Sequence, residues 1–303
     1  LLYLIIKMCG IVFYKVNKKK NLSLFKEKLL KSSKLIRHRG PDWSGNSIYK
    51  GKENNILISH ERLSIIDPIG GSQPIIYQKN NGHKIILAVN GEIYNYKELK
   101  IDEHKYLTSS DCEVIISQYL NCGDDYNLLL DSLDGQFAFV LYDTEKELLL
   151  SGRDPIGIAS LYYGLDNENN LMISSEMKAL YLCENVFTFP NGNYLLLDNK
   201  DYNLETIKNN FISYYSKNSF GRWLINSSIP DNLISIKENQ EQKFYDLVKN
   251  TLIKSVEKRL MSDVPFGVLL SGGLDSSLIT SITVKLIKEN KTKLNWGDKI
   301  HSF

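Results

Sequence analysis

The stretch SGGLDSS, residues 271–277, follows an apolar run at 266–270 and leads into a helical pattern at 275–288. Its two glycines allow a tight turn close to an anion, and the free N–H groups of a helix start favour a phosphate or pyrophosphate. No lysine is present, so the stretch is not the G-x-x-x-x-G-K-[ST] loop. A plain turn with a Ser or Asp helix cap is the alternative. The order strand, turn, helix predicts the opening of an α/β domain with a parallel sheet.

The motif SGG-x-DSS resembles the pyrophosphate loop of ATP pyrophosphatases, which adenylate a substrate and release pyrophosphate. The resemblance implies that the loop binds ATP through Leu270, Ser271, Gly272, Gly273, Leu274, Asp275, Ser276 and Ser277. An amphipathic helical pattern from Lys243 to about Leu260 precedes the loop. Residues 243–303 are too few for a whole doubly wound sheet, so we expect a truncated domain.

Composition limits the class of protein. The 303 residues allow about two domains at roughly 150 residues each. Lys and Arg number 37 against 35 Asp and Glu, a net charge of +2, which argues against a nucleic-acid or membrane-surface binder. No apolar run approaches the ~20 residues of a membrane span. The four cysteines show neither C-x-x-C spacing nor a His cluster, so we expect no structural zinc and a reducing, cytoplasmic compartment; any other metal ligand is left unassigned.

Residues 9–198 carry many strand-like runs and a few helices. A buried strand is expected at 9–14. Further strands are expected at 56–59, 85–89, 137–142, 148–151, 161–163, 171–173 and 194–197, and helices at 22–36, 112–120 and 175–182. A Gly/Pro/Ser loop is expected at 37–45. This pattern predicts an α+β sandwich that ends near Asp198. The polar residues 199–242 are interpreted as a linker or variable loop, and residues 243–303 as the next domain.

Cys9 follows Met8 in CGIV, and a buried cysteine on a strand is most often a small hydrophobic residue. Seven further motifs change this interpretation: RHRGPD (37–42), HERLSIID (60–67), AVNGEIYN (88–95), SDCEV (110–114), LDGQFAF (133–139), GRDPIG (152–157) and SSEMKAL (174–180). In this order, and with SGGLDSS, they resemble the glutamine-dependent asparagine synthetases. The resemblance runs from Met8 to Phe303 and weakens only across the linker.

The resemblance implies an N-terminal-nucleophile amidotransferase fold, with two antiparallel sheets between helix layers in the order α-β-β-α. It implies an ATP-dependent carbon–nitrogen ligase that takes glutamine, aspartate and ATP, uses Mg²⁺, and admits a homodimer. Aspartate is adenylated, pyrophosphate leaves, and ammonia from glutamine attacks the acyl-adenylate to give asparagine. Because water would destroy that intermediate, ammonia is expected to pass through an apolar interior channel.

The amidase chemistry follows from Cys9 once Met8 is removed. An α-amine, with a usual pKa of about 7.7–8.0, can then act as the base for the thiol of the same residue. The resemblance assigns Asn90 and Gly91 to the oxyanion hole, Arg62 to the α-carboxylate of glutamine, and Glu92 and Asp111 to its α-ammonium. The same site takes in Leu63, Ser64, Ile65 and Ile66.

Each of these residues has a simpler interpretation. Arg62 could pair with Glu61 on the surface, Asn90-Gly91 is a common hairpin turn, and Asp111 could cap the helix that follows it.

The segment LLYLIIK precedes Met8. If it is retained, Cys9 has no free amine and the base is lost, so we expect a translation-start error, removal of the segment, or an inactive amidase site. The chain itself should hydrolyse glutamine at best. Glucosamine-6-phosphate synthase and the purine-pathway phosphoribosyl amidotransferase share the Cys-start domain but lack SGGLDSS, and β-lactam-forming relatives usually lack the cysteine. An inactive or regulatory fragment is the remaining alternative.

Overall fold

The computed structural model describes residues 8–198, 202–215, 238–289 and 300–303. The chain divides into two compact units, the first ending at Tyr214 and the second beginning at Tyr215. We describe each unit by itself.

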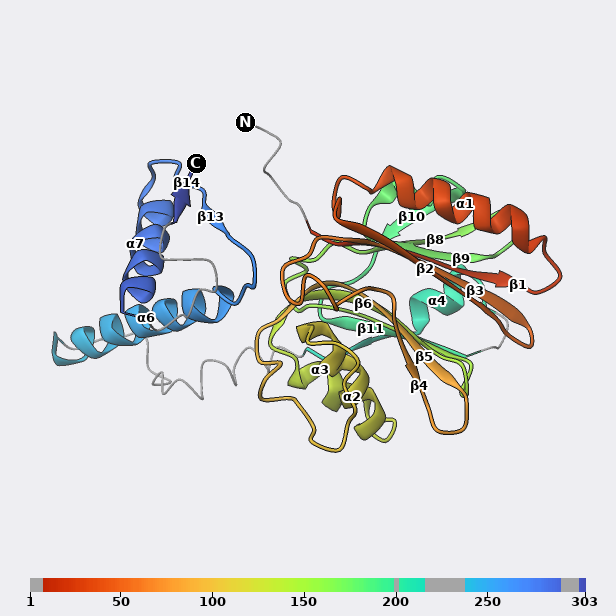
Figure 1. Ribbon diagram of the computed structural model, residues 1–303, viewed down its shortest axis with the longest axis horizontal. Coiled ribbons are helices and arrows are strands. Elements are labelled where there is room, and N and C mark those ends of the chain that lie inside the picture. Colours follow the sequence, from red (N-terminus) through yellow and green to blue (C-terminus); the bar gives the residue numbers. More distant parts are fainter. Residues whose placement is uncertain (1–7, 199–201, 216–237, 290–299) are drawn as a thin grey trace. The chain divides into compact units, whose positions relative to one another are not determined.

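The first unit is built on two six-stranded antiparallel sheets (Figure 1). The first sheet has the order β10 (Cys183–Thr188), β8 (Tyr162–Asp166), β9 (Leu171–Ser174), β1 (Gly10–Asn17), β3 (Asn54–Arg62) and β2 (Trp43–Lys50). The second has the order β12 (Phe211–Ser213), β11 (Asn193–Leu197), β7 (Leu148–Arg153), β6 (Gly135–Asp143), β5 (Lys84–Ile93) and β4 (Ile75–Gln78).

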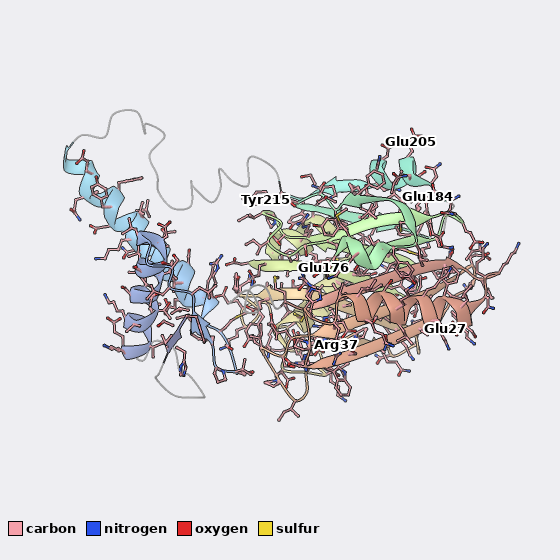
Figure 2. All side chains as sticks on the ribbon, turned by 90° about the horizontal axis from the view of Figure 1, so that it is seen from above. Glu27, Arg37, Glu176, Glu184, Glu205 and Tyr215 are labelled. Carbon is pink, nitrogen blue, oxygen red and sulfur yellow. The ribbon has the colours of Figure 1, made fainter. Side chains whose placement is uncertain are left out.

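Helices cover the outer faces of both sheets. Helix α1 (Leu22–Leu35) packs on β1 and β3, and α2 (Val114–Asn121) and α3 (Tyr126–Ser132) lie on the second sheet (Figure 1). Seen from above, Glu27 lies within α1 and Arg37 lies just beyond its C-terminal end (Figure 2). The layer order α-β-β-α expected from the sequence is therefore confirmed.

Strand β1 shows why the layers form. Its side chains alternate, so that Ile11 and Phe13 join the core between the sheets while Val12 and Tyr14 join the core under α1. Asn21 is the N-cap of helix α1, and its side chain accepts hydrogen bonds from two backbone N–H groups. The helix buries Phe25 and Leu29. The register of a strand buried on both faces is strongly fixed, because a one-residue slip would turn the side chains of each core into the other.

Several boundaries differ from the sequence expectation. The helix expected at 112–120 begins as a 3₁₀ turn, Asp111–Glu113, before α2. The helix expected at 175–182 is only the 3₁₀ turn Met177–Leu180, after which the chain enters β10. The loop expected at 37–45 ends earlier, because β2 starts at Trp43 and pairs with β3.

The first unit extends past Asp198, where its end was expected. Helix α4 (Leu204–Asn209) buries Ile207 completely, and β12 pairs with β11. The hydroxyl of Tyr214 donates to the carbonyl oxygen of Arg153 at 2.8 Å. Much of the expected linker at 199–242 lies outside the described residues.

The second unit has helix α6 (Glu238–Arg259), strand β13 (Gly267–Val268), helix α7 (Leu274–Lys288) and strand β14 (His301–Ser302), which pairs with β13 in parallel. The strand–turn–helix order is confirmed. The expectation of a buried strand at 266–270 is wrong, because Leu269 is 59% exposed and β13 pairs only with β14 in the part of the chain described. No described helix combines the length and hydropathy needed to cross a membrane.

Candidate functional site

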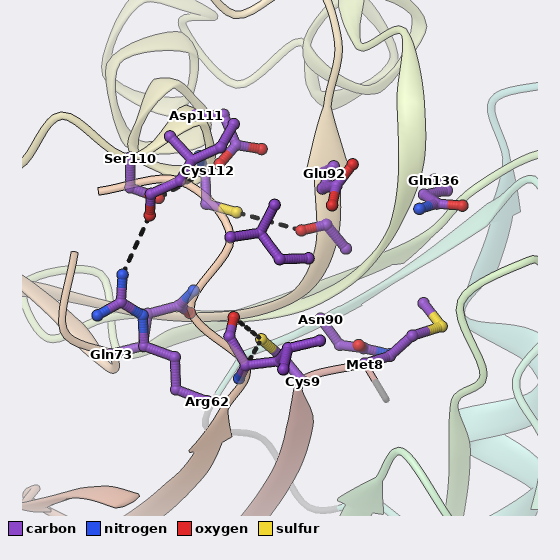
Figure 3. A pocket seen from close by; sticks show the side chains of 14 residues that line it. Met8, Cys9, Arg62, Gln73, Asn90, Glu92, Ser110, Asp111, Cys112 and Gln136 are labelled. Carbon is purple, nitrogen blue, oxygen red and sulfur yellow. Dashed lines mark hydrogen bonds between the residues drawn. The ribbon is translucent and has the colours of Figure 1, made fainter. Parts of the chain in front are cut away.

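A cavity of about 100 Å³ in the first unit brings together most of the residues singled out in the sequence (Figure 3). It is lined by Met8, Cys9, Arg62, Leu63, Ile65, Ile66, Gln73, Asn90, Gly91, Glu92, Ser110, Asp111, Cys112 and Gln136. Ser64 is not among them, because its N–H turns away to donate to the Asp42 carboxylate at 2.8 Å. The cavity lies at the start of β1, next to Cys9, where the end of β3 places Arg62 and β5 places Asn90.

Cys9 lies immediately before β1. Its Sγ accepts a hydrogen bond from the Leu63 N–H at 3.4 Å and contacts the Leu63 carbonyl oxygen at 3.6 Å (Figure 3). Burial raises the pKa of the thiol to about 11. A neutral thiol is a weak nucleophile, so the site needs a base close to the sulfur.

Arg39, in the RHRGPD motif, holds the backbone of Cys9. Its Nε donates to the Cys9 carbonyl oxygen at 2.9 Å, and its Nη1 contacts Glu176 at 3.2 Å. The remaining nitrogen, Nη2, is buried and has no hydrogen-bond partner within the described ranges.

Asn90 and Gly91 lie inside β5, paired with β6, so they do not form a hairpin turn. Asn90 is fully buried, and neither its Oδ1 nor its Nδ2 has a hydrogen-bond partner among the described residues. Buried amides are nearly always paired, so this one is available to a ligand in the cavity. Gly91 has φ +144°, and a Cβ there would lie 2.0 Å from the Gln136 carbonyl oxygen, so only glycine fits.

Arg62 does not pair with Glu61. Neighbouring residues on a strand point to opposite faces, and the Glu61 carboxylate binds Arg37 at 2.6 Å. The Arg62 guanidinium instead donates to main-chain carbonyl oxygens of the following loop, to Ile66 at 3.1 Å and Asp67 at 2.6 Å. No carboxylate pairs with it in the described part of the chain, so its charge is available to an anion.

Two carboxyl groups share the cavity. Burial, assisted by the charge of Asp111, raises the pKa of Glu92 to about 7, and burial raises that of Asp111 to about 6. Asp111 is not the helix cap, because Ser110 Oγ accepts the Cys112 N–H, whereas Asp111 Oδ2 accepts the Ile93 N–H at 2.7 Å. A cationic ligand group would relieve the repulsion between the two carboxylates.

Sequence reasoning missed five lining residues: Met8, Gln73, Ser110, Cys112 and Gln136. Ser110, Cys112 and Gln136 lie within the quoted motifs SDCEV and LDGQFAF, so the motifs could have found them. Gln73 carried no signal, because its role depends on the fold: its Oε1 accepts the Val89 N–H at 2.7 Å, next to Asn90.

Residues 271–273 form the turn that precedes α7, and residues 274–277 are the first turn of that helix. Gly272 has φ +84°, Gly273 is the N-cap of α7, and the hydroxyls of Ser276 and Ser277 both donate to the Gly273 carbonyl oxygen. Residues 271–275 are exposed, and Ser276 and Ser277 are half-buried. Across the described residues of both units, no group of three or more His, Cys, Asp or Glu side chains could hold a metal ion.

Residues 8–207 match the glutamine amidotransferase domain family, and residues 247–303 match the asparagine synthase family. The asparagine synthetase B [glutamine-hydrolyzing] of Escherichia coli (strain K12) is 41% identical over 286 residues, which are 92% of this chain and 46% of that protein. The asparagine synthetase [glutamine-hydrolyzing] 2 of Oryza sativa subsp. japonica is 40% identical over 302 residues, 98% of this chain and 45% of that protein. The chain therefore spans about half the length of the curated relatives it matches.

Among solved structures, the glutamine phosphoribosylpyrophosphate amidotransferase from B. subtilis matches with a TM-score of 0.54 and 18% identity, covering 90% of this chain and 63% of that one. An allosteric regulatory enzyme of purine biosynthesis matches with a TM-score of 0.56 and 18% identity, covering 69% of this chain and 50% of that one. At this identity the likeness concerns the fold, and it supports the two-sheet architecture expected from the sequence.

Proposed function

The chain belongs to the glutamine amidotransferase domain family, and we propose that its first unit hydrolyses glutamine with Cys9 as the nucleophile. The observation that carries the proposal is the unpartnered, fully buried amide of Asn90 in the same small cavity as the Cys9 thiol. An oxyanion that forms when the sulfur attacks an amide needs such a donor in place beforehand.

The reaction starts with Cys9 as the first residue of the mature chain. Its α-amine takes the thiol proton, and the sulfur attacks the side-chain amide carbon of glutamine. The proton passes to the leaving nitrogen, ammonia departs, and a glutamyl thioester remains. Water then adds to the thioester, its proton returns the sulfur to the thiol, and glutamate leaves. We assign the oxyanion to the Asn90 side chain and the Gly91 N–H.

The charged groups of the cavity suit a free amino acid. Arg62 would bind the α-carboxylate of glutamine, and Glu92 and Asp111 its α-ammonium. Leu63, Ile65 and Ile66 line the same cavity, while Ser64 supports the loop from outside it. A protein side-chain amide lacks both head-group charges, so this clamp would select free glutamine.

For the whole protein, we infer the reaction printed in the names of its relatives, glutamine-dependent asparagine synthesis. Residues 270–277 would bind ATP at the start of α7, aspartate would be adenylated, and ammonia would be carried between the sites. The first unit would end near Tyr214, and the synthetase unit would begin near residue 243. We assign no Mg²⁺ ligand. A cytoplasmic location and a homodimer stay part of the proposal.

The test is glutamate release from a chain whose first residue is Cys9. The substitution Cys9→Ala should lower the rate at least about 10³-fold, because the nucleophile is lost. Cys122→Ala is the matched control, since this cysteine is half-buried and lies outside the cavity, and it should leave the rate unchanged. Hydrolysis that survives Cys9→Ala would disprove Cys9 as the nucleophile, and no hydrolysis at all by the chain that starts at Cys9 would favour the inactive-fragment alternative. Equal activity in a chain that keeps Met8 would disprove the amine base.

A further inference from the structure

Two loops border the cavity, and Asp67 joins them. The first loop, residues 63–74, connects β3 to β4, and the second, residues 94–110, leads from β5 to the turn at Asp111. Asp67 Oδ2 accepts the Ser109 N–H of the second loop at 2.8 Å. Its Oδ1 accepts the Gly70 N–H of its own loop at 2.9 Å. The two carboxylate oxygens therefore serve different loops.

The main chain of Asp67 reaches a third partner. Its carbonyl oxygen accepts Arg62 Nη2 at 2.6 Å and the Gly71 N–H at 3.0 Å. Asp67 has φ 51°, in the left-handed region that aspartate enters more readily than most residues. This backbone conformation lets one residue hold an arginine through its carbonyl and a separate loop through its side chain.

Packing around these contacts is tight. A Cβ on Gly71 would lie 2.5 Å from Arg62 Nη2, and a Cβ on Gly70 would lie 2.8 Å from Asp67 Oδ2. The two glycines thus allow the loop to close on Arg62 and on the Asp67 carboxylate.

We propose that Asp67 is a positioning residue for glutamine binding. It fixes Arg62 through its carbonyl oxygen and, through Ser109, the segment that carries Asp111 two residues later. The inference rests on the proposed function, in which Arg62 holds the α-carboxylate and Asp111 the α-ammonium (Figure 3). Asp67 would keep these two charges at the separation that an amino-acid head group requires, and would have no contact with the reacting amide.

A purely structural role predicts something different. Loss of a loop contact that only stabilises the fold would lower the melting temperature and affect every reaction of Cys9 alike. Loss of a positioning contact would weaken recognition of the head group and leave the chemistry of the thiol intact. The two roles separate when Cys9 reacts with two electrophiles, one that carries an α-amino and an α-carboxylate group and one that carries neither.

The variants are Asp67→Ala, Asp67→Asn and, as a control, Asp102→Ala, an exposed aspartate on the 94–110 loop. The protein is the whole chain with Cys9 as its first residue. The probes are iodoacetamide and a glutamine-shaped diazoketone that keeps both head-group charges. Labelling rates at Cys9 are measured by mass spectrometry, and KM and kcat for glutamine by glutamate release.

For Asp67→Ala we expect the rate ratio of diazoketone to iodoacetamide to fall at least tenfold, KM to rise correspondingly, and kcat to stay within about threefold. Asp67→Asn keeps one acceptor oxygen, so its rate ratio should fall only about threefold. The ratio of Asp102→Ala should match that of the wild type. If Asp67→Ala does not fold, the rate ratio of Asp67→Asn alone tests the inference. A ratio unchanged in both folded variants, or an equal loss with both probes, overturns the inference while wild-type glutamine hydrolysis upholds the proposed function. A wild type that neither hydrolyses glutamine nor prefers the diazoketone overturns both.

Discussion

Arg39 donates a hydrogen bond of 2.9 Å from its Nε to the carbonyl oxygen of Cys9. The same guanidinium contacts Glu176, which follows β9, so one side chain links the nucleophile to the end of the strand that neighbours β1. The planar fork of arginine makes both contacts at once, and lysine has no second donor in that geometry.

Arg39→Lys should therefore lower kcat for glutamine hydrolysis by roughly tenfold or more, because the backbone of the nucleophile loses its support. Lys178→Ala is the matched control, since Lys178 contacts the same Glu176 carboxylate at 3.0 Å from a half-exposed position. Steady-state kinetics on both variants is the measurement. A wild-type kcat in Arg39→Lys would show that the contact does not position Cys9.

Asn90→Ala should lower kcat by about 10²–10³-fold with little loss of stability. Its amide is buried without a partner in the described structure, so the free protein loses no hydrogen bond on substitution. Asn95→Ala is the opposite case, because the Asn95 amide donates to the Ser132 carbonyl oxygen at 2.9 Å and accepts the Asp134 N–H at 3.0 Å.

Kinetics and thermal unfolding measured on both asparagine variants give the comparison. We expect Asn95→Ala to melt earlier and keep most of its kcat. An Asn90→Ala protein that melts much earlier than the wild type, or that retains kcat, would contradict a role in oxyanion binding.

Glu92→Gln should stabilise the unliganded protein at pH 8 and weaken glutamine binding. Burial raises the Glu92 pKa from a usual 4.5 to about 7, so ionisation is easier in the unfolded chain than in the folded one. The stability contributed by the neutral acid is present below pH 4.5 and is lost as the pH rises through 7. The glutamine side chain that the substitution places at position 92 cannot ionise, so the stability of the variant does not fall over this pH range.

Thermal unfolding at pH 4 and pH 8, with KM measured at pH 8, tests the prediction. The melting temperature of the variant should exceed that of the wild type at pH 8 and equal it at pH 4, while KM rises. A variant that is less stable at pH 8 would mean that Glu92 is already paired in the free protein.

Ile207→Ala should destabilise the first unit by about 2–5 kcal/mol, because α4 buries this side chain completely in the core between the sheets. Ile212→Ala, on β12, is the control, since that side chain is 39% exposed and should cost under about 1 kcal/mol. Urea unfolding of the two variants is the measurement. Equal, small effects would place residues 202–214 outside the stable unit, as the sequence alone had suggested.

The motifs predicted which residues lie together, while the roles assigned to those residues stay predictions. Cys9, Arg62, Asn90 and Asp111 lie far apart in the sequence, and the structure brings all four to one cavity. The roles of Gln73 and Asp67 could not be predicted in this way. The Gln73 side chain accepts the Val89 N–H and the Asp67 side chain accepts the Ser109 N–H, and such contacts with distant main-chain groups leave no pattern in the local sequence.

The fold was predictable where apolar periodicity is strong. Strands β1, β5 and β6 are buried along most of their length, so their apolar runs stand out. Strands β2 and β12 carry polar and exposed residues and were missed. Helix α4 has six residues and only Ile207 buried, too little for a helical pattern to show.

Strand β1 pairs with β3 along its whole length and with β9 along half of it, and it starts one residue after Cys9. Chain termini usually fray, and a nucleophile on a frayed first residue would seldom be aligned with its substrate. With Cys9 as the first residue, as proposed, the nucleophile is joined directly to a strand that is paired on both sides, and this pairing restrains it. Glutamine would then meet a sulfur already held still, and the entropy lost on binding would be its own and not that of the protein.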